Sequence, residues 1–135
     1  MKEIIESVVE VRGEAKDDSR WPTKRSGYRV KTNKQTVSLL IDDYQDCCEN
    51  YGWLQSEDDL EKFVGAELLG VSTTDTALVT MDVDPLAYLG DGDVIFVTLT
   101  TNKGPLQFAV YNAHNGYYGH SVYIESADFT MEDII

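Results

Sequence analysis

The stretch that decides the fold is Val94-Ile95-Phe96-Val97-Thr98-Leu99-Thr100-Thr101, followed by the turn Asn102-Lys103-Gly104-Pro105 and the run from Leu106 to Ala113. Two runs rich in apolar and β-branched residues, joined by a short turn that contains glycine, predict a β-hairpin. The first four residues are apolar on both faces of the strand, because side chains alternate along it. We therefore expect this strand to lie in the middle of a sheet.

Similar runs on both sides of this hairpin predict further strands. The residues Asn33-Lys34-Gln35 separate two of these runs as a hairpin turn. Because most neighbouring runs are joined by short turns, we expect the sheet to be mainly antiparallel. The expected strands are Ile4–Arg12, Tyr28–Thr32, Thr36–Ile41, Glu67–Thr73, Thr76–Met81 and Tyr118–Glu125.

One short helix is predicted over residues 56–64. Ser56 can accept a hydrogen bond at its start, and the acidic residues after it complement the positive end of the helix dipole. Gly65 suits the C-terminal stop. These acids therefore have a structural explanation. The buried face of this helix would consist of Leu60, Phe63 and Val64.

The predicted fold class is α+β, with a mainly antiparallel sheet of about seven strands and one short helix. The length of 135 residues favours a single domain over residues 1–135. Residues 14–26 are polar and predict a long loop, and residues 126–135 predict a tail that either docks or frays.

The N-terminal residues favour a cytoplasmic protein. Carboxylates of Glu3 and Glu6 interrupt the first apolar run, which argues against a secretory signal. No apolar run approaches the roughly 20 residues that cross a bilayer.

The formal net charge of −13 is unevenly spread along the chain. Residues 1–34 hold nine basic and six acidic residues, a balance of +3, whereas residues 35–135 hold two basic and eighteen acidic residues, a balance of −16. Such a surface repels phosphate, which argues against direct nucleic-acid binding. It suits a basic protein partner, including one whose basic groove normally holds nucleic acid. The alternative is that the acidity only keeps the protein soluble.

Both cysteines and both histidines fall in two short segments, residues 42–53 and residues 114–120. The cysteines are adjacent, so they do not make an ordinary disulfide. Sulfur and nitrogen ligands of this kind suit a structural zinc ion, and we expect the fold to bring the two segments together. The candidate metal ligands are Cys47, Cys48, His114 and His120, with Asp46, Glu49 or Asp43 completing the site. The alternative is a buried cysteine beside an exposed one, with surface histidines near a turn.

Aromatic and acidic residues gather around the same two segments. Tyrosine and tryptophan often anchor protein interfaces, although they also line ordinary cores. The candidate partner-binding residues are Asp42, Asp43, Tyr44, Tyr51, Trp53, Tyr117 and Tyr118.

A metal- or thiol-dependent enzyme is an alternative interpretation, with Cys47 or Cys48 acting together with His120. The strongly negative surroundings disfavour a thiolate, because they raise the pKa of a thiol. The chain also lacks a serine nucleophile elbow, a phosphate-binding glycine loop and a dinucleotide motif. We therefore predict no catalytic residues.

Four segments resemble a family of small acidic proteins of unassigned function from phages, prophages and their bacterial hosts. The segments are Gln45-Asp46-Cys47-Cys48-Glu49, Val64–Val71, Asn115-Gly116-Tyr117-Tyr118 and Ser121–Glu125, and the resemblance spans roughly residues 28–125. The family pattern often has another polar residue at the positions of His114 and His120.

Small acidic phage proteins include inhibitors of host defence. The resemblance therefore implies an anti-CRISPR protein that acts on a Cas9-type nuclease in the host cytosol and blocks its nucleic-acid loading. Cas9 holds its nucleic acids in positively charged channels, which the acidic chain would suit. The other alternative is a non-catalytic structural or regulatory phage protein without a nuclease target.

Overall fold

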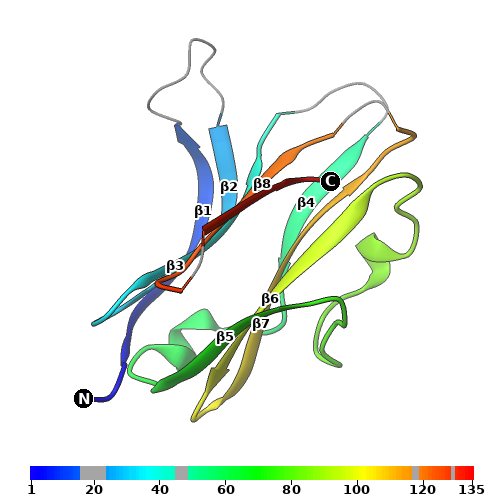
Figure 1. Cartoon of the computed structure of the whole chain (residues 1–135). Coiled ribbons are helices and arrows are strands. Elements are labelled where there is room, and N and C mark those ends of the chain that lie inside the picture. The colour runs from blue at the N-terminus through cyan, green and yellow to red at the C-terminus, as the bar shows by residue number, and fades with distance from the viewer. Residues whose placement is uncertain (16–23, 45–48, 117–118, 129) are drawn as a thin grey trace.

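The protein is a sandwich of two β-sheets (Figure 1). A computed structural model describes residues 1–15, 24–44, 49–116, 119–128 and 130–135. In these ranges every pair of neighbouring strands is antiparallel. The elements are β1 (Ile5–Ala15), β2 (Lys24–Thr32), β3 (Thr36–Asp42), β4 (Asn50–Gln55), the 3-10 helix η1 (Leu60–Phe63), β5 (Leu68–Thr74), the 3-10 helix η2 (Asp84–Leu86), β6 (Asp93–Thr101), β7 (Gly104–Ala113), β8 (Ser121–Glu125) and β9 (Thr130–Ile134).

The predicted central hairpin is confirmed. One sheet has the strand order β1-β2-β3-β8-β9 and the other has the order β4-β7-β6-β5, so that β6 and β7 form the middle of the second sheet. Their register runs from Asp93 opposite Asn112 to Thr101 opposite Gly104. Inner positions on both sheets need apolar side chains, which the runs of this hairpin supply.

The core lies between the two sheets. Tyr28 of β2 stacks on Phe108 of β7 across the interface, with ring centroids 4.4 Å apart and planes 11° apart. Alternation along β3 and β8 directs their apolar residues into the same layer. These buried residues are Val37, Leu39, Ile41, Val122 and Ile124.

The helix predicted over residues 56–64 is reduced to the four-residue 3-10 helix η1. Its cap is Asp59, whose side chain accepts a hydrogen bond from the backbone N–H of Glu61. Ser56 does not cap a helix, because it extends the pairing of β4 with β7: its hydroxyl accepts a hydrogen bond from the N–H of Gln107, and its own N–H donates to the carbonyl of Gln107.

The strand predicted over Thr76–Met81 is wrong, because those residues are irregular. The side-chain amide of Gln107 accepts a hydrogen bond from the N–H of Leu78 and donates one to the carbonyl of Thr76. These backbone groups therefore bond to a side chain and not to the backbone of a neighbouring strand. The connection between β5 and β6 crosses the outer face of its sheet, where a small apolar cluster covers the strands (Figure 1). The centre of that cluster consists of Met81, Phe96 and Ala109.

The fold is more purely β than the predicted α+β class with about seven strands. The described residues form nine strands. The prediction missed β4, which follows the cysteine segment, and β9, which the tail forms by pairing with β8.

The loop predicted over residues 14–26 is shorter at both ends, because Ala15 of β1 still pairs with Lys24 of β2.

None of the helices that the structure describes is long and apolar enough to cross a membrane.

Candidate functional site

The two segments that hold the histidines and cysteines meet at one end of the sandwich. β3 ends at Asp42 in one sheet and β4 begins at Asn50 in the other, so the chain crosses between the sheets here. In the register of β3 with β8, Ile41 lies opposite Val122, which brings His120 to the end of β3. The predicted convergence of these two segments is therefore observed at their described residues.

The centre of this end of the molecule is a buried pair of His120 and Glu49. The Nε2 atom of His120 lies 2.6 Å from Oε2 of Glu49, and its Nδ1 atom lies 2.7 Å from the backbone carbonyl oxygen of Asp42. Both side chains of the pair have 0% of their surface exposed. Buried polar groups need hydrogen-bond partners, and the geometry supplies them for both nitrogens of His120 and for Oε2 of Glu49.

The position of one proton on His120 follows from the chemistry of its partners. A carbonyl oxygen can only accept a hydrogen bond, so Nδ1 must carry a proton and donate it to Asp42. The bond between Nε2 and Glu49 then holds one further proton, which belongs to either the imidazole or the carboxyl group. In both cases the pair has no net charge, which lowers the cost of burying it.

Two tyrosines cover the two faces of the His120 ring. The ring of Tyr44 lies 4.4 Å from it with an interplanar angle of 10°, and the ring of Tyr51 lies 4.5 Å away at 29°. The hydroxyl of Tyr44 also donates to the carbonyl of Gly119 over 3.2 Å. Because the imidazole is enclosed and both its nitrogens are hydrogen-bonded, this geometry does not favour His120 as the base of a thiol enzyme.

The carboxylate of Asp43 is held in the same network. It accepts hydrogen bonds from the hydroxyls of Tyr51 and Ser26, and the oxygen–oxygen distance is 2.5 Å in each. The hydroxyl of Ser26 in turn accepts a hydrogen bond from the N–H of Gly13. Ser26 was missed by sequence reasoning, because it was assigned to a loop. Its place in β2 and its hydrogen bonds with Gly13 and Asp43 show that it belongs to this network.

Asp42 is also directed inward. It is only 8% exposed, and its carboxylate accepts a hydrogen bond from the hydroxyl of Tyr123 over 3.1 Å. The guanidinium of Arg25 lies over the ring of Tyr123, 4.4 Å from its centroid. Asp42 therefore serves the interior of this network, whereas it was predicted to contact a partner.

Two aromatic residues predicted to bind a partner lie at the rim of this network. Tyr44 is 37% exposed. Trp53 of β4 is partly buried against the core, and its indole N–H donates to Glu10 of β1 over 2.6 Å. Tyr44 thus has surface available for a partner, whereas the polar atom of Trp53 is already used within the fold.

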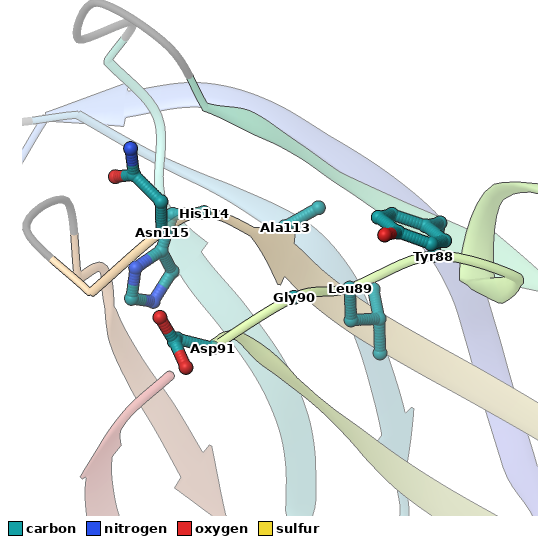
Figure 2. A pocket seen from close by; sticks show the side chains of 7 residues that line it. All are labelled: Tyr88, Leu89, Gly90, Asp91, Ala113, His114 and Asn115. Atoms are coloured by element: carbon teal, nitrogen blue, oxygen red, sulfur yellow. The ribbon is translucent and has the colours of Figure 1, made fainter.

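His114 lies in different surroundings from His120. It follows β7, and its Nδ1 accepts a hydrogen bond from the N–H of Gly116 over 2.9 Å. Figure 2 shows its ring pointing toward the carboxylate of Asp91 in a pocket of about 350 Å³, with Tyr88 and Leu89 further along the same wall. Two backbone segments that line the pocket are joined by a hydrogen bond, which the N–H of Asp91 donates to the carbonyl of His114. The hydrogen bonds of the two histidines go to different residues.

The cysteine half of the predicted metal site lies outside the described residues, as do some of the predicted partner-binding aromatics. These residues are Asp46, Cys47, Cys48, Tyr117 and Tyr118. Within the residues that the structure does describe, no group of three or more His, Cys, Asp and Glu side chains could hold a metal ion.

His120 and Glu49 fit two ligands of the predicted zinc site. Histidines that bind metals usually donate their other ring N–H to a carbonyl or carboxylate, as Nδ1 of His120 does. A tetrahedral zinc ion between Nε2 and Oε2 would need these atoms about 3.3 Å apart, which follows from bond lengths of about 2.0 Å. The pair would therefore open from its present 2.6 Å by less than 1 Å. Zinc stays a prediction.

Tyr51 and two core tyrosines should titrate abnormally. Burial raises the pKa of Tyr51 above its usual value, and the hydrogen bond to Asp43 raises it further. Burial also raises the pKa of Tyr28 and of Tyr111. In the unfolded chain these phenols ionise near pH 10. The folded state keeps these phenols neutral. Their contribution to the free energy of unfolding is therefore fully present below about pH 10, and it is lost as the pH rises above that value, because the unfolded chain then ionises more readily than the folded protein.

A spectroscopic titration checks this expectation. The phenols of Tyr28, Tyr51 and Tyr111 should ionise only as the protein unfolds, so that a late phase in the rise of tyrosinate absorbance coincides with unfolding. The Tyr51→Phe variant should remove one tyrosine from the late phase. Ionisation of Tyr28, Tyr51 and Tyr111 in the folded protein, without a late phase that coincides with unfolding, would contradict the assignment.

The comparisons with known proteins identify a family. The chain belongs to the family described as Domain of unknown function (DUF7448), whose model matches residues 2–124. No curated protein and no solved structure matches the chain.

Proposed function

We propose that this protein is a non-catalytic phage-type inhibitor that binds a basic surface of a protein in the bacterial cytoplasm. The observation that carries the proposal is the balance of −16 over residues 35–135, which include only two basic residues, Lys62 and Lys103. A surface of this kind attracts basic proteins and repels nucleic acid. The resemblance to small acidic phage proteins makes a Cas9-type nuclease the proposed target, with its nucleic-acid channel as the contact surface.

The distribution of exposed carboxylates supports an electrostatic contact. The described acids at the His120 end, Asp42, Asp43 and Glu49, form hydrogen bonds within the fold, whereas most of the described acids after residue 50 are exposed. The salt bridges among the described residues include none of these exposed acids, because Glu57, which pairs with Lys62, is half-buried. The exposed acids are Asp58, Asp59, Glu61, Asp75, Asp82, Asp84, Asp91, Asp93, Glu125, Asp128, Glu132 and Asp133.

The buried pair of His120 and Glu49 gives this function a rigid frame. It joins the end of β3 to the segment before β4, and thus ties one sheet to the other. A structural zinc ion at this place remains part of the proposal, with His120 and Glu49 as two of its ligands and with Cys47 or Cys48 from the adjoining sequence. Its role would be to hold the frame, and binding itself would come from the acidic surface and from aromatic contacts such as Tyr44.

The test is direct binding to a purified Cas9 nuclease, measured with and without its guide RNA at about 0.15 M salt. We expect binding to the guide-free nuclease, competition with guide RNA and loss of DNA cleavage. Raising the salt to about 1 M shortens the Debye length from about 8 to about 3 Å, so the affinity should fall at least tenfold. Cys47→Ser and Cys48→Ser variants that remain folded should bind normally.

Two results would count against the proposal. One is the absence of binding to both forms of the nuclease at physiological salt. The other is an activity that a single cysteine substitution abolishes in a folded protein, which would favour the thiol-enzyme alternative.

A further inference from the structure

The C-terminal strand β9 has an open backbone edge. It is the last strand of its sheet, and in the part of the chain that the structure describes no strand lies beyond it. Ile135 exchanges two backbone hydrogen bonds with His120 of the β8 side. Because hydrogen-bonded and non-bonded pairs alternate along an antiparallel ladder, Asp133 and Met131 also direct their backbone groups toward β8. Those of Thr130, Glu132 and Ile134 therefore point outward.

An acidic groove runs beside this open edge. It has a volume of about 520 Å³ and lies between β9 and the strands β5 and β6 of the other sheet. Its walls combine carboxylates with apolar side chains. These lining residues are Asp75, Asp93, Asp133, Val94, Ile95 and Met131.

The three carboxylates of the groove are available to a cation. Each uses one oxygen in a local hydrogen bond: Asp93 accepts from the N–H of Val94, Asp133 from the N–H of Ile134, and Asp75 from the hydroxyl of Thr76. None of the ion pairs among the described residues includes them. Asp93 of β6, Asp133 of β9 and Asp75, which directly follows β5, thus line one groove that has no basic residue in its lining.

A second copy of this chain does not suit the edge. If β9 paired antiparallel with β9 of another copy about its middle residue, Glu132 would lie opposite Glu132 and Met131 opposite Asp133. Like charges directly opposite one another destabilise a strand pair. The acidic edge therefore disfavours pairing with β9 of a second copy and favours pairing with a strand of positive charge.

We propose that the edge of β9 and the groove beside it receive an extended basic segment of the protein partner. The segment adds as a strand to β9, with its backbone bonded to Thr130 and Glu132. Its alternate side chains are lysine or arginine, and they enter the groove because side chains of a strand alternate. Their aliphatic stems pack on Val94, Ile95 and Met131, and their charged ends reach the carboxylates. This proposal rests on the proposed function, because it names the surface that a basic partner uses.

The test uses a probe that does not depend on any nuclease. A capped peptide of alternating lysine and valine is titrated into the protein at low salt, and binding is followed by the protein's amide signals. We expect shifts and slower hydrogen exchange at Thr130 and Glu132. The same peptide with N-methyl groups on alternate backbone nitrogens should bind at least about tenfold more weakly, since it cannot complete the ladder.

A pair of triple variants separates the groove from general electrostatics. D75N/D93N/D133N removes three charges while keeping the oxygens that accept the local hydrogen bonds. We expect this variant to bind the peptide about tenfold more weakly, because it loses three exposed ion pairs that each contribute modestly to the affinity. The matched control removes the same charge at exposed positions outside the groove and should weaken binding less than about threefold. Its substitutions are D58N, D82N and D84N.

The outcomes are distinct. Equal loss in the two triple variants, or equal binding of the N-methylated peptide, would overturn the proposed strand addition even if the protein still binds a Cas9 nuclease. Peptide binding at β9 with no binding to the nuclease would support this groove and refute that nuclease as the target.

Discussion

Replacing Glu49 by alanine should lower the free energy of unfolding by about 3–5 kcal/mol, because it leaves His120 buried without the partner of its Nε2 atom. The two side chains have no exposed surface, so water cannot easily take the place of the carboxylate. In a domain of this size the loss corresponds to a fall in melting temperature of roughly 10 °C or more. Thermal and denaturant unfolding followed by circular dichroism measure both quantities.

A matched control separates burial from charge. Glu57→Ala also removes a glutamate from an ion pair, but Glu57 lies 3.4 Å from Lys62, and the lysine side chain is 46% exposed. Exposed pairs of this kind contribute about 1 kcal/mol or less. If Glu49→Ala costs no more than Glu57→Ala, the buried pair does not hold this end of the sandwich together.

A double variant tests whether the cost comes from the unpaired partner. Replacing Glu49 by leucine and His120 by phenylalanine removes both polar groups and retains aromatic stacking with Tyr44 and Tyr51. Buried ion pairs exchanged for apolar residues of similar size are often close to neutral. We therefore expect the double variant to recover a large part of the loss. A double variant as unstable as the sum of its single changes would argue for independent roles.

Local sequence patterns were sufficient for the middle of each sheet. The hairpin of β6 and β7 has a turn with glycine and apolar residues on both faces, and these features depend only on near neighbours. The alternation of Val37, Leu39 and Ile41 likewise predicts one buried face, which the structure confirms. What these patterns do not contain is the partner of a strand from far along the chain.

The missed elements depend on distant residues. β4 is short and has a glycine in its middle, and Gly52 fits because Tyr111 of β7 fills the space beside it. The predicted helix lost its cap because Ser56 bonds Gln107, fifty-one residues away. Gln107 also holds the irregular residues Thr76 and Leu78. One polar residue in an inner strand therefore overrides two local preferences.

The candidate site could be predicted in location but not in detail. Confinement of cysteine and histidine to two segments indicated that these segments meet, and His120 does reach the region of Asp42 and Glu49. The separate position of His114 follows from the pairing of Gly90 with His114, which no local motif encodes. The same applies to the groove beside β9, because a tail without a clear pattern forms its wall.

Replacing Gly27 by alanine should destabilise the protein by about 3 kcal/mol or more, an effect in the tail of the distribution for single substitutions. Gly27 lies in β2 between Val11 of β1 and Leu40 of β3, in the interior of the five-stranded sheet. Its φ of +151° is a conformation that other residues rarely adopt. A Cβ atom there would lie 2.0 Å from the backbone oxygen of Leu39, a contact that only a backbone shift relieves.

Two further glycines separate the two causes of this destabilisation, the strain of a positive φ and the clash of the added Cβ atom. Gly65 also has a positive φ, +86°, but a Cβ atom there meets nothing within 4 Å, so Gly65→Ala should cost only the conformational strain of about 1–2 kcal/mol. Gly70 has open space and no positive φ, so Gly70→Ala should stay within about 0.5 kcal/mol. The order Gly27, Gly65, Gly70 in chemical denaturation is the expected result. Equal losses at Gly27 and Gly65 would show that β2 can move away from β3, and that the backbone of this sheet is less tightly fixed than its register indicates.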